Sequence, residues 1–129
     1  MTMRAALHSS VDEPPARQLK SRLRQDLALA MRSGAKSDVG VLRTLLAAID
    51  NAEAVQVGDV HYRYVVRQFL DRSAEVPRRD LSHNDLQDLI RRDRDERLRV
   101  AADVASRGRM DRARELRREA ALVSRYILD

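Results

Sequence analysis

The sequence contains two groups of side chains that could bind a substrate or a partner, and the first is acidic. Asp50, Asn51 and Glu53 lie within four residues of one another beside a run of apolar residues. Such an acid and amide cluster could orient a substrate or a partner. The structural alternative is that these side chains satisfy a helix end and pair with arginines such as Arg43 or Arg78, because a carboxylate removed from water needs a partner. The sequence favours this alternative.

The second group is basic. The chain has 25 basic and 20 acidic residues, a net charge of +5, and the first and last predicted helices hold the excess positive charge. Each of these helices carries three basic residues on one face, namely Arg17, Lys20 and Arg24 on the first and Arg114, Arg118 and Arg125 on the last. If the two faces are adjacent, they form a basic ridge suited to RNA phosphates or another anion. No aromatic residues interleave to stack on bases. An ordinary solvated surface, with Glu115 and Glu119 as internal partners, is the alternative.

The sequence lacks the residues that other kinds of functional site need. The chain has no cysteine, which excludes a disulfide or a thiolate metal site. His8, His61 and His83 do not have the spacing of three or four residues that places metal ligands on one helix face. The sequence shows no Gly-rich phosphate loop and no nucleophile elbow around a serine. We therefore expect no metal, no cofactor and no catalytic residue in this chain.

Composition favours one small helical domain. Hydrophobic residues make up 43% and charged residues 35% of the 129 residues, a balance that suits a helical bundle with charged outer faces. The longest apolar runs fall far short of the roughly 20 residues that a membrane span needs. The first seven residues lack the apolar run of a secretory signal. We expect no membrane association and a cytoplasmic location.

Apolar periodicity of 3.6 residues predicts an all-α fold that positions both groups. Residues 1–13 read as a flexible leader and residues 14–129 as one domain. The first helix begins at Pro14 or Pro15 and ends at Gly34, since proline suits a first turn and glycine a left-handed end. The second begins with Ser37 or Asp38 as its cap, runs to about residue 55 and should be the most buried helix.

Two further helices complete a compact antiparallel bundle of four main helices. Ser82 and Asp85 resemble a capping box at the start of a helix that runs to about Ser106. The last helix begins near Asp111. A short extra helix is predicted between residues 59 and 79 from the apolar stripe of Tyr62, Val65, Val66, Phe69 and Leu70. This stripe packs into the core or, alternatively, forms a patch for self-association or a partner helix.

The second predicted helix reads LRTLLAAIDNAEA from Leu42 to Ala54, which resembles the LR-x-LLAAI-x-NAE signature of the GatB/YqeY family. Gly108-Arg109 and the residues after them resemble the family's GR…A…E…L…YL pattern, and the segment 75–79 resembles a variant of the family in Arg-rich proteins. The residues that match the family signature are Arg43, Asn51, Ala52, Glu53, Pro77, Arg78, Gly108 and Arg109.

The resemblance implies a non-catalytic helical domain like the one near the C-terminus of the B subunit of tRNA-dependent amidotransferases. Those enzymes are carbon-nitrogen ligases that amidate misacylated Glu-tRNA or Asp-tRNA with glutamine as amido donor, and their chemistry lies in other domains. The implied role is therefore tRNA-associated or accessory to an amidotransferase, with tRNA or a tRNA-handling protein as partner. Family members usually continue into a second, smaller domain, which we expect to be absent here. The alternative function is a protein interaction or dimerisation module without RNA binding, which would form a homo-oligomer.

Overall fold

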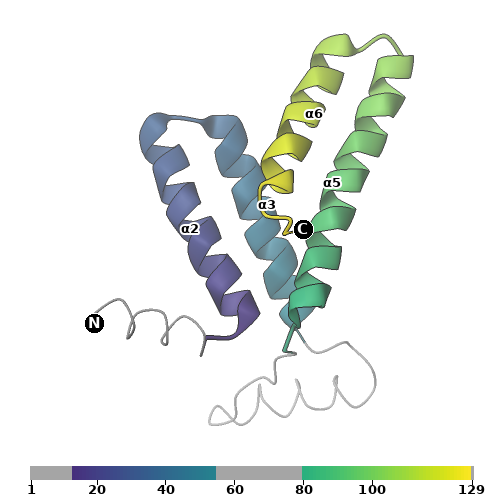
Figure 1. The fold of residues 1–129 in the computed structure, drawn as a ribbon. Helices are drawn as coiled ribbons and strands as arrows, with labels where there is room; N and C mark the ends of the chain where they lie inside the picture. The colour runs from purple at the N-terminus through teal and green to yellow at the C-terminus, as the bar shows by residue number, and fades with distance from the viewer. Residues whose placement is uncertain (1–12, 55–79, 129) are drawn as a thin grey trace, which may run out of the picture.

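The computed structural model describes residues 13–54 and 80–128, which fold into four α-helices (Figure 1). In chain order these are α2 (Pro15–Ser33), α3 (Lys36–Glu53), α5 (His83–Ser106) and α6 (Met110–Ser124). α2 and α3 form one antiparallel hairpin, α5 and α6 form a second, and the hairpins pack against each other chiefly through α3. The predicted compact bundle of four main helices is confirmed. The predicted leader (apart from residue 13) and the short extra helix lie outside the described residues.

The first hairpin turns within two residues. Pro15 occupies the first turn of α2, and Gly34 ends the helix with a φ of 74°, the left-handed conformation that favours glycine. The chain then enters α3 at once, because Val39 N–H already bonds to the carbonyl oxygen of Ala35 over 3.0 Å. The cap of α3 is therefore Ala35, which has no capping side chain, and the prediction of Ser37 or Asp38 at this position was wrong.

The second hairpin begins with the predicted capping box. The Ser82 hydroxyl accepts from Asp85 N–H and the Asp85 carboxylate accepts from Ser82 N–H, each over 3.0 Å. These two bonds satisfy backbone donors that the first turn of a helix leaves free. Gly108, with a φ of 81°, turns the chain between the two helices, and α6 starts one residue before the predicted Asp111.

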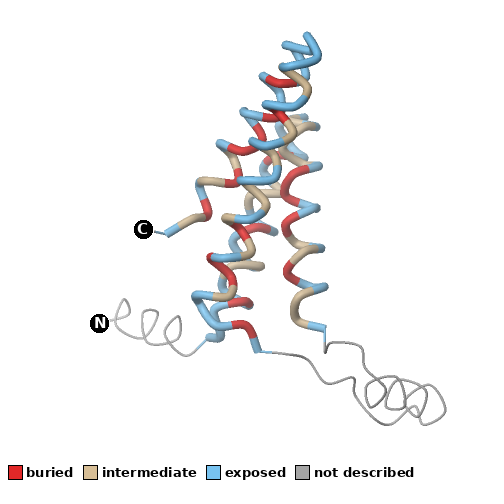
Figure 2. The backbone as a smooth tube through the Cα atoms, turned by 90° about the vertical axis from the view of Figure 1, so that its right-hand side faces the viewer, coloured by how far each residue is buried: buried red, intermediate tan, exposed pale blue. Residues whose placement is uncertain are grey.

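The core lies where the two hairpins meet. Figure 2 shows the buried residues along the inner sides of the helices. The largest fully buried side chains are those of Leu23, Leu42, Leu45, Ile49, Leu86, Ile90 and Val123. They come from all four helices, and α3 supplies three of them, as its apolar stripe predicts. Burial of one such side chain is worth about 1.5–3 kcal/mol, so the core holds the hairpins in a fixed relation.

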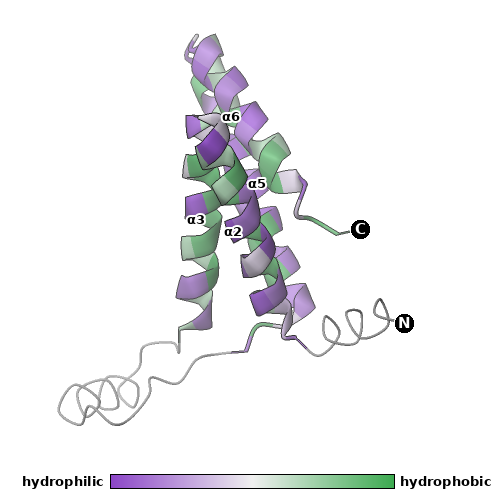
Figure 3. Cartoon of the chain, turned by 90° about the vertical axis from the view of Figure 1, so that its left-hand side faces the viewer, coloured by the Kyte–Doolittle hydropathy of each residue, from purple (hydrophilic) through white to green (hydrophobic). Residues whose placement is uncertain are grey.

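The α5–α6 hairpin projects beyond α2 and α3 (Figure 1). We call its outer part, residues 97–120, the distal hairpin. In Figure 3 the outer part of α5 and α6 carries mostly hydrophilic residues. Four buried apolar residues of this part, Ala101, Ala113, Leu116 and Ala120, lie outside the main core cluster. The distal hairpin is therefore stabilised by contacts between its own two helices.

Candidate functional site

The carboxylates of the predicted acidic cluster pair with a lysine of the neighbouring helix. Lys20 Nζ on α2 lies 2.5 Å from Glu53 Oε1 and 3.3 Å from Asp50 Oδ1 on α3. The Lys20 and Glu53 side chains are 14% and 13% exposed, whereas that of Asp50 is 52% exposed. Arg43 is not the partner, because it is exposed on the outer side of α3 whereas Glu53 faces α2. Arg78 lies outside the described residues.

The basic residues of α2 share an open depression with acidic residues. The depression has a volume of about 900 Å³ and lies between the start of α2 and the end of α3. Its basic side chains are Arg17, Lys20 and Arg24, and its acidic ones are Asp50, Glu53 and Asp80. Lys20 forms the ion pairs of this face, and none engages Arg17 or Arg24 within the described residues. Because opposite charges at short range offset each other, the neighbouring acidic side chains offset the positive potential of this α2 face only in part.

The basic residues of α6 have a different setting. Arg114, Arg118 and Arg125 are exposed and lie opposite the buried side of α6, which consists of Ala113, Leu116, Glu119, Ala120 and Val123. At 1.5 Å per residue the row is about 16 Å long. Arg114 Nη2 lies 3.0 Å from Asp111 Oδ1. Within residues 13–54 and 80–128, no ion pair engages Arg118 or Arg125. We call these three residues the arginine row of α6.

The two basic faces do not form one ridge. α6 packs along α5 and α3, and within the described ranges α2 does not pack along α6. α2 instead contacts the end of α6, where Arg22 Nη2 donates to the carbonyl oxygen of Arg125 over 3.3 Å and the Tyr126 hydroxyl donates to Asp26. The adjacency that a continuous ridge requires is absent, so the two basic faces are separate candidate surfaces, and the arginine row of α6 is the one that lies apart from the acidic residues of the α2 depression.

The signature residues of α3 fall on both sides of the helix. Ala52 is partly buried against the core, and Glu53 is held by Lys20. Arg43 and Asn51 are exposed on the outer side. Packing and pairing therefore explain Ala52 and Glu53 as structural residues, whereas Arg43 and Asn51 are available to a partner.

The remaining signature residues lie at turns or outside the described ranges. Gly108 is explained by its positive φ, which would strain any residue with a Cβ. Arg109 is exposed and serves as the N-cap of α6 without a capping side-chain bond. Pro77 and Arg78 lie in the segment 55–79, outside the described residues.

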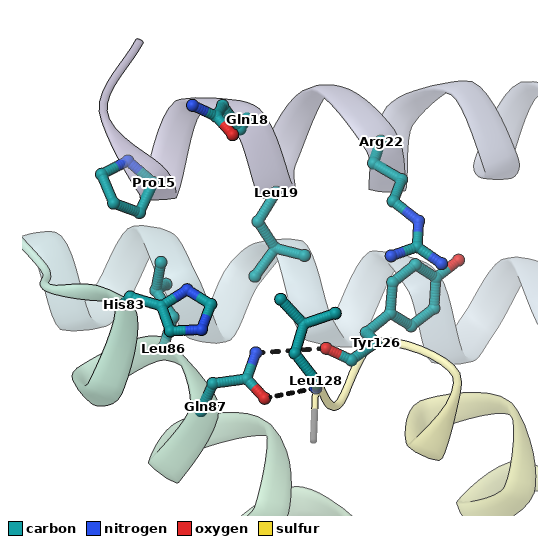
Figure 4. A pocket seen from close by; sticks show the side chains of 9 residues that line it. All are labelled: Pro15, Gln18, Leu19, Arg22, His83, Leu86, Gln87, Tyr126 and Leu128. Carbon is teal, nitrogen blue, oxygen red and sulfur yellow. Dashed lines mark hydrogen bonds between the residues drawn. The ribbon is translucent and has the colours of Figure 1, made fainter. Parts of the chain in front are cut away.

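A further depression, of about 230 Å³, lies between α2, the start of α5 and the C-terminal segment (Figure 4). Buried Gln87 of α5 contacts the backbone of that segment. Its Nε2 donates to the carbonyl oxygen of Tyr126 over 3.3 Å, and its Oε1 accepts from Leu128 N–H over 2.6 Å. Sequence reasoning missed this residue. The available signal was its position between Leu86 and Ile90, on the apolar side of the helix.

Tyr126 is the buried aromatic residue beside this depression. The guanidinium of Arg22 lies 4.7 Å from the ring centroid, a cation–π distance, and the hydroxyl donates to Asp26 Oδ2 over 2.5 Å. Burial, followed by the hydrogen bond to Asp26, raises the pKa of the Tyr126 hydroxyl well above its usual range. Tyr126 is therefore a neutral hydrogen-bond donor with a structural role.

The described residues were also compared with the requirements of a metal site and of a membrane-spanning helix. Among them, no group of three His, Cys, Asp or Glu side chains could hold a metal ion. None of the four helices in these ranges combines the length and apolar character that crossing a membrane requires. His83 lines the depression beside Gln87, whereas His8 and His61 lie outside the described residues.

Comparison of the chain with protein-family models, curated proteins and solved structures found no match. The GatB/YqeY relationship therefore stays a prediction that rests on the residues quoted above.

Proposed function

We propose that the chain is a non-catalytic, GatB/YqeY-like helical domain with a tRNA-associated or amidotransferase-accessory role, and that RNA binds to the arginine row of α6. The supporting observation is the exposure of Arg114 and Arg118 on α6 and of Arg125, its C-cap residue, along one side of the helix. A guanidinium presents a planar fork of donors that fits phosphate oxygens. Arg118 and Arg125 have no acidic partner among the described residues, so their charge is free to attract an anion.

The surroundings of the row favour backbone recognition over base recognition. Tyr126, the aromatic residue of the described ranges, is buried and engaged with Asp26, so it is not available to stack on bases. Contacts to phosphates position a nucleic acid and carry no sequence information. The row is therefore expected to bind RNA with little sequence preference and with strong dependence on salt.

The test is binding of total tRNA to the purified protein by fluorescence anisotropy over a range of salt concentrations. Each phosphate contact contributes about 0.7–0.9 to the slope of log K against log salt. The triple variant R114Q/R118Q/R125Q should therefore lower the affinity and reduce the slope by about 2–3. Unchanged affinity or an unchanged slope would exclude the arginine row as the RNA-binding surface.

A matched control removes the same charge elsewhere. Arg32, Arg92 and Arg99 are exposed on α2 and α5, and Arg99 pairs with Glu96 three residues away, as Arg114 does with Asp111. The variant R32Q/R92Q/R99Q should retain most of the affinity if the location of the charge matters. Equal losses in the two variants would mean that only net charge attracts the RNA.

The second candidate function is a protein interaction or dimerisation module without RNA binding. The outer side of α3 supports it, since it is exposed and rich in small residues. Under this alternative, tRNA binding disappears at physiological salt while association between protein chains persists.

A further inference from the structure

The outer side of α3 carries a row of small, exposed residues whose spacing alternates between four and three. The row consists of Gly40, Thr44, Ala47 and Asn51 on α3 and of Ala54, the extended C-cap residue directly after the helix. This alternation places the residues along one line of a helix, as in the seam between two packed helices. Within the described residues no element covers this line.

The described part of the chain does not explain why residue 40 is a glycine. Its φ is not positive, and a Cβ at this position would meet no atom within 4 Å. Glycine inside a helix destabilises it by about 0.5–1 kcal/mol relative to alanine. A glycine does, however, let another helix approach closely, because the distance between packed helices depends on the side chains at their contact.

Two charged residues flank the row on one side and make it complementary to itself. Arg43 lies four residues before Ala47, and Asp50 lies three residues after it. In an antiparallel pair of α3 helices with a two-fold axis at Ala47, positions equally far before and after Ala47 lie opposite each other. Arg43 of one copy then lies within one residue of Asp50 of the other, and the symmetry produces this contact twice.

Both charged groups are available for such a contact. Arg43 is exposed and makes no ion pair within the described residues. The Asp50 side chain is half exposed, and its contact with Lys20 uses Oδ1 over 3.3 Å. A carboxylate has two oxygens and about four acceptor sites, so Asp50 can accept a second cation. Lys20 remains held by Glu53 over 2.5 Å.

We infer that the outer side of α3 is a self-association surface, through which two copies of this chain pair in antiparallel orientation. Ala47 lies against Ala47 of the second copy, and Gly40 lies opposite Ala54 of that copy. Arg43 pairs with Asp50 of the second copy. The helical part of the row, from Gly40 to Asn51, spans about 16 Å, which is short for a stable interface of about 1,200–2,000 Å². The dimer is therefore expected to be weak and to form only at high protein concentration.

The test uses the absence of cysteine from the chain. Ala47→Cys places one thiol on the two-fold axis, where the Cα atoms of the two copies come within reach of a disulfide. Ala121→Cys, exposed on α6, is the matched control. Under mild oxidation at equal concentration, Ala47→Cys should form covalent dimers roughly tenfold faster, because pairing raises the local thiol concentration. Equal rates for the two variants would overturn the inference.

Charge reversal tests the proposed contact within the Ala47→Cys background. Arg43→Glu places two carboxylates opposite each other, so cross-linking should slow to the rate of the Ala121→Cys control. Adding Asp50→Lys restores opposite charges and should restore the rate. A rate unaffected by Arg43→Glu, or not restored in the double variant, would contradict this arrangement. Circular dichroism of each variant verifies the fold.

Sedimentation equilibrium of the unmodified chain provides an independent measurement. The mass should rise with concentration from 14.7 kDa toward twice that value and no further, because a two-fold interface closes on itself. A constant mass up to several hundred micromolar, or a mass that passes the dimer, would overturn the inference.

Discussion

The hydroxyl of Tyr126 donates a hydrogen bond to Asp26 Oδ2 over 2.5 Å, across a separation of 100 residues in the sequence. Asp26 lies in the middle of α2, and Tyr126 lies two residues after the end of α6. Arg22, one turn before Asp26, covers the Tyr126 ring and bonds to the carbonyl oxygen of Arg125. Since α2 and α6 do not pack along each other, these contacts tie the end of the second hairpin to the first.

Tyr126→Phe should lower the free energy of unfolding by about 1–2 kcal/mol, because it removes the bond and leaves partly buried Asp26 without its donor. The ring and its contact with Arg22 remain. Urea denaturation measures the change. A double-mutant cycle with Asp26→Asn should give a coupling energy of at least about 0.5 kcal/mol. Strictly additive effects would show that the two residues act separately.

The raised pKa of Tyr126 makes stability depend on pH at the alkaline end. An unfolded tyrosine ionises near pH 10, and burial and Asp26 hold the folded pKa higher. The stabilisation is therefore complete below about pH 10 and is lost as the pH rises toward the folded pKa. The free energy of unfolding should fall more steeply between pH 10 and 12 in the natural chain than in Tyr126→Phe. Parallel curves would contradict this expectation.

Gln87 should be necessary for docking of the C-terminal segment. Gln87→Met keeps the size of the side chain but removes both bonds to the backbone of Tyr126 and Leu128. We expect a loss of about 1–3 kcal/mol in the free energy of unfolding and faster hydrogen exchange at the Leu128 amide. Gln25→Met, on the exposed side of α2, is the control and should change stability by less than about 0.5 kcal/mol. Similar losses in both variants would argue against a specific role for Gln87.

Local signals in the sequence predicted the elements well. Gly34 ends α2, and Ser82 with Asp85 caps α5, because these residues act through bonds within their own turn. The spacing of Arg114, Arg118 and Arg125 likewise fixes their common side, since a helix repeats every 3.6 residues. Information of this kind concerns residues within one turn or along a single helix.

Relations between helices were not predictable in the same way. Periodicity shows that one side of α2 is buried but does not say which helix it faces. The pairing of Glu53 with Lys20 instead of Arg43 depends on how α2 lies along α3. The separation of the two basic faces depends on α6 packing against α5 and α3. The role of Gln87 was not predictable because its partners are backbone atoms 39 and 41 residues away in the sequence.

The distal hairpin should unfold separately from the core when its ion pairs are weakened. Arg97 lies 2.7 Å from Asp93 and 2.6 Å from Glu119, and all three side chains are largely buried. Glu119→Gln keeps the size of the side chain but removes the charge that faces Arg97. Since breaking a buried pair leaves a charge uncompensated, we expect a loss of about 1–3 kcal/mol.

Hydrogen exchange would locate this loss. Because the distal hairpin packs on itself, amides around Ala101 and Ala113 should exchange faster in Glu119→Gln, while those around Leu45 should keep their protection. Glu96→Gln breaks an exposed pair with Arg99 on the same helix and should leave both regions unchanged, since exposed pairs contribute little. Uniform acceleration across the chain in Glu119→Gln would instead mean that the distal hairpin and the core unfold as one cooperative unit.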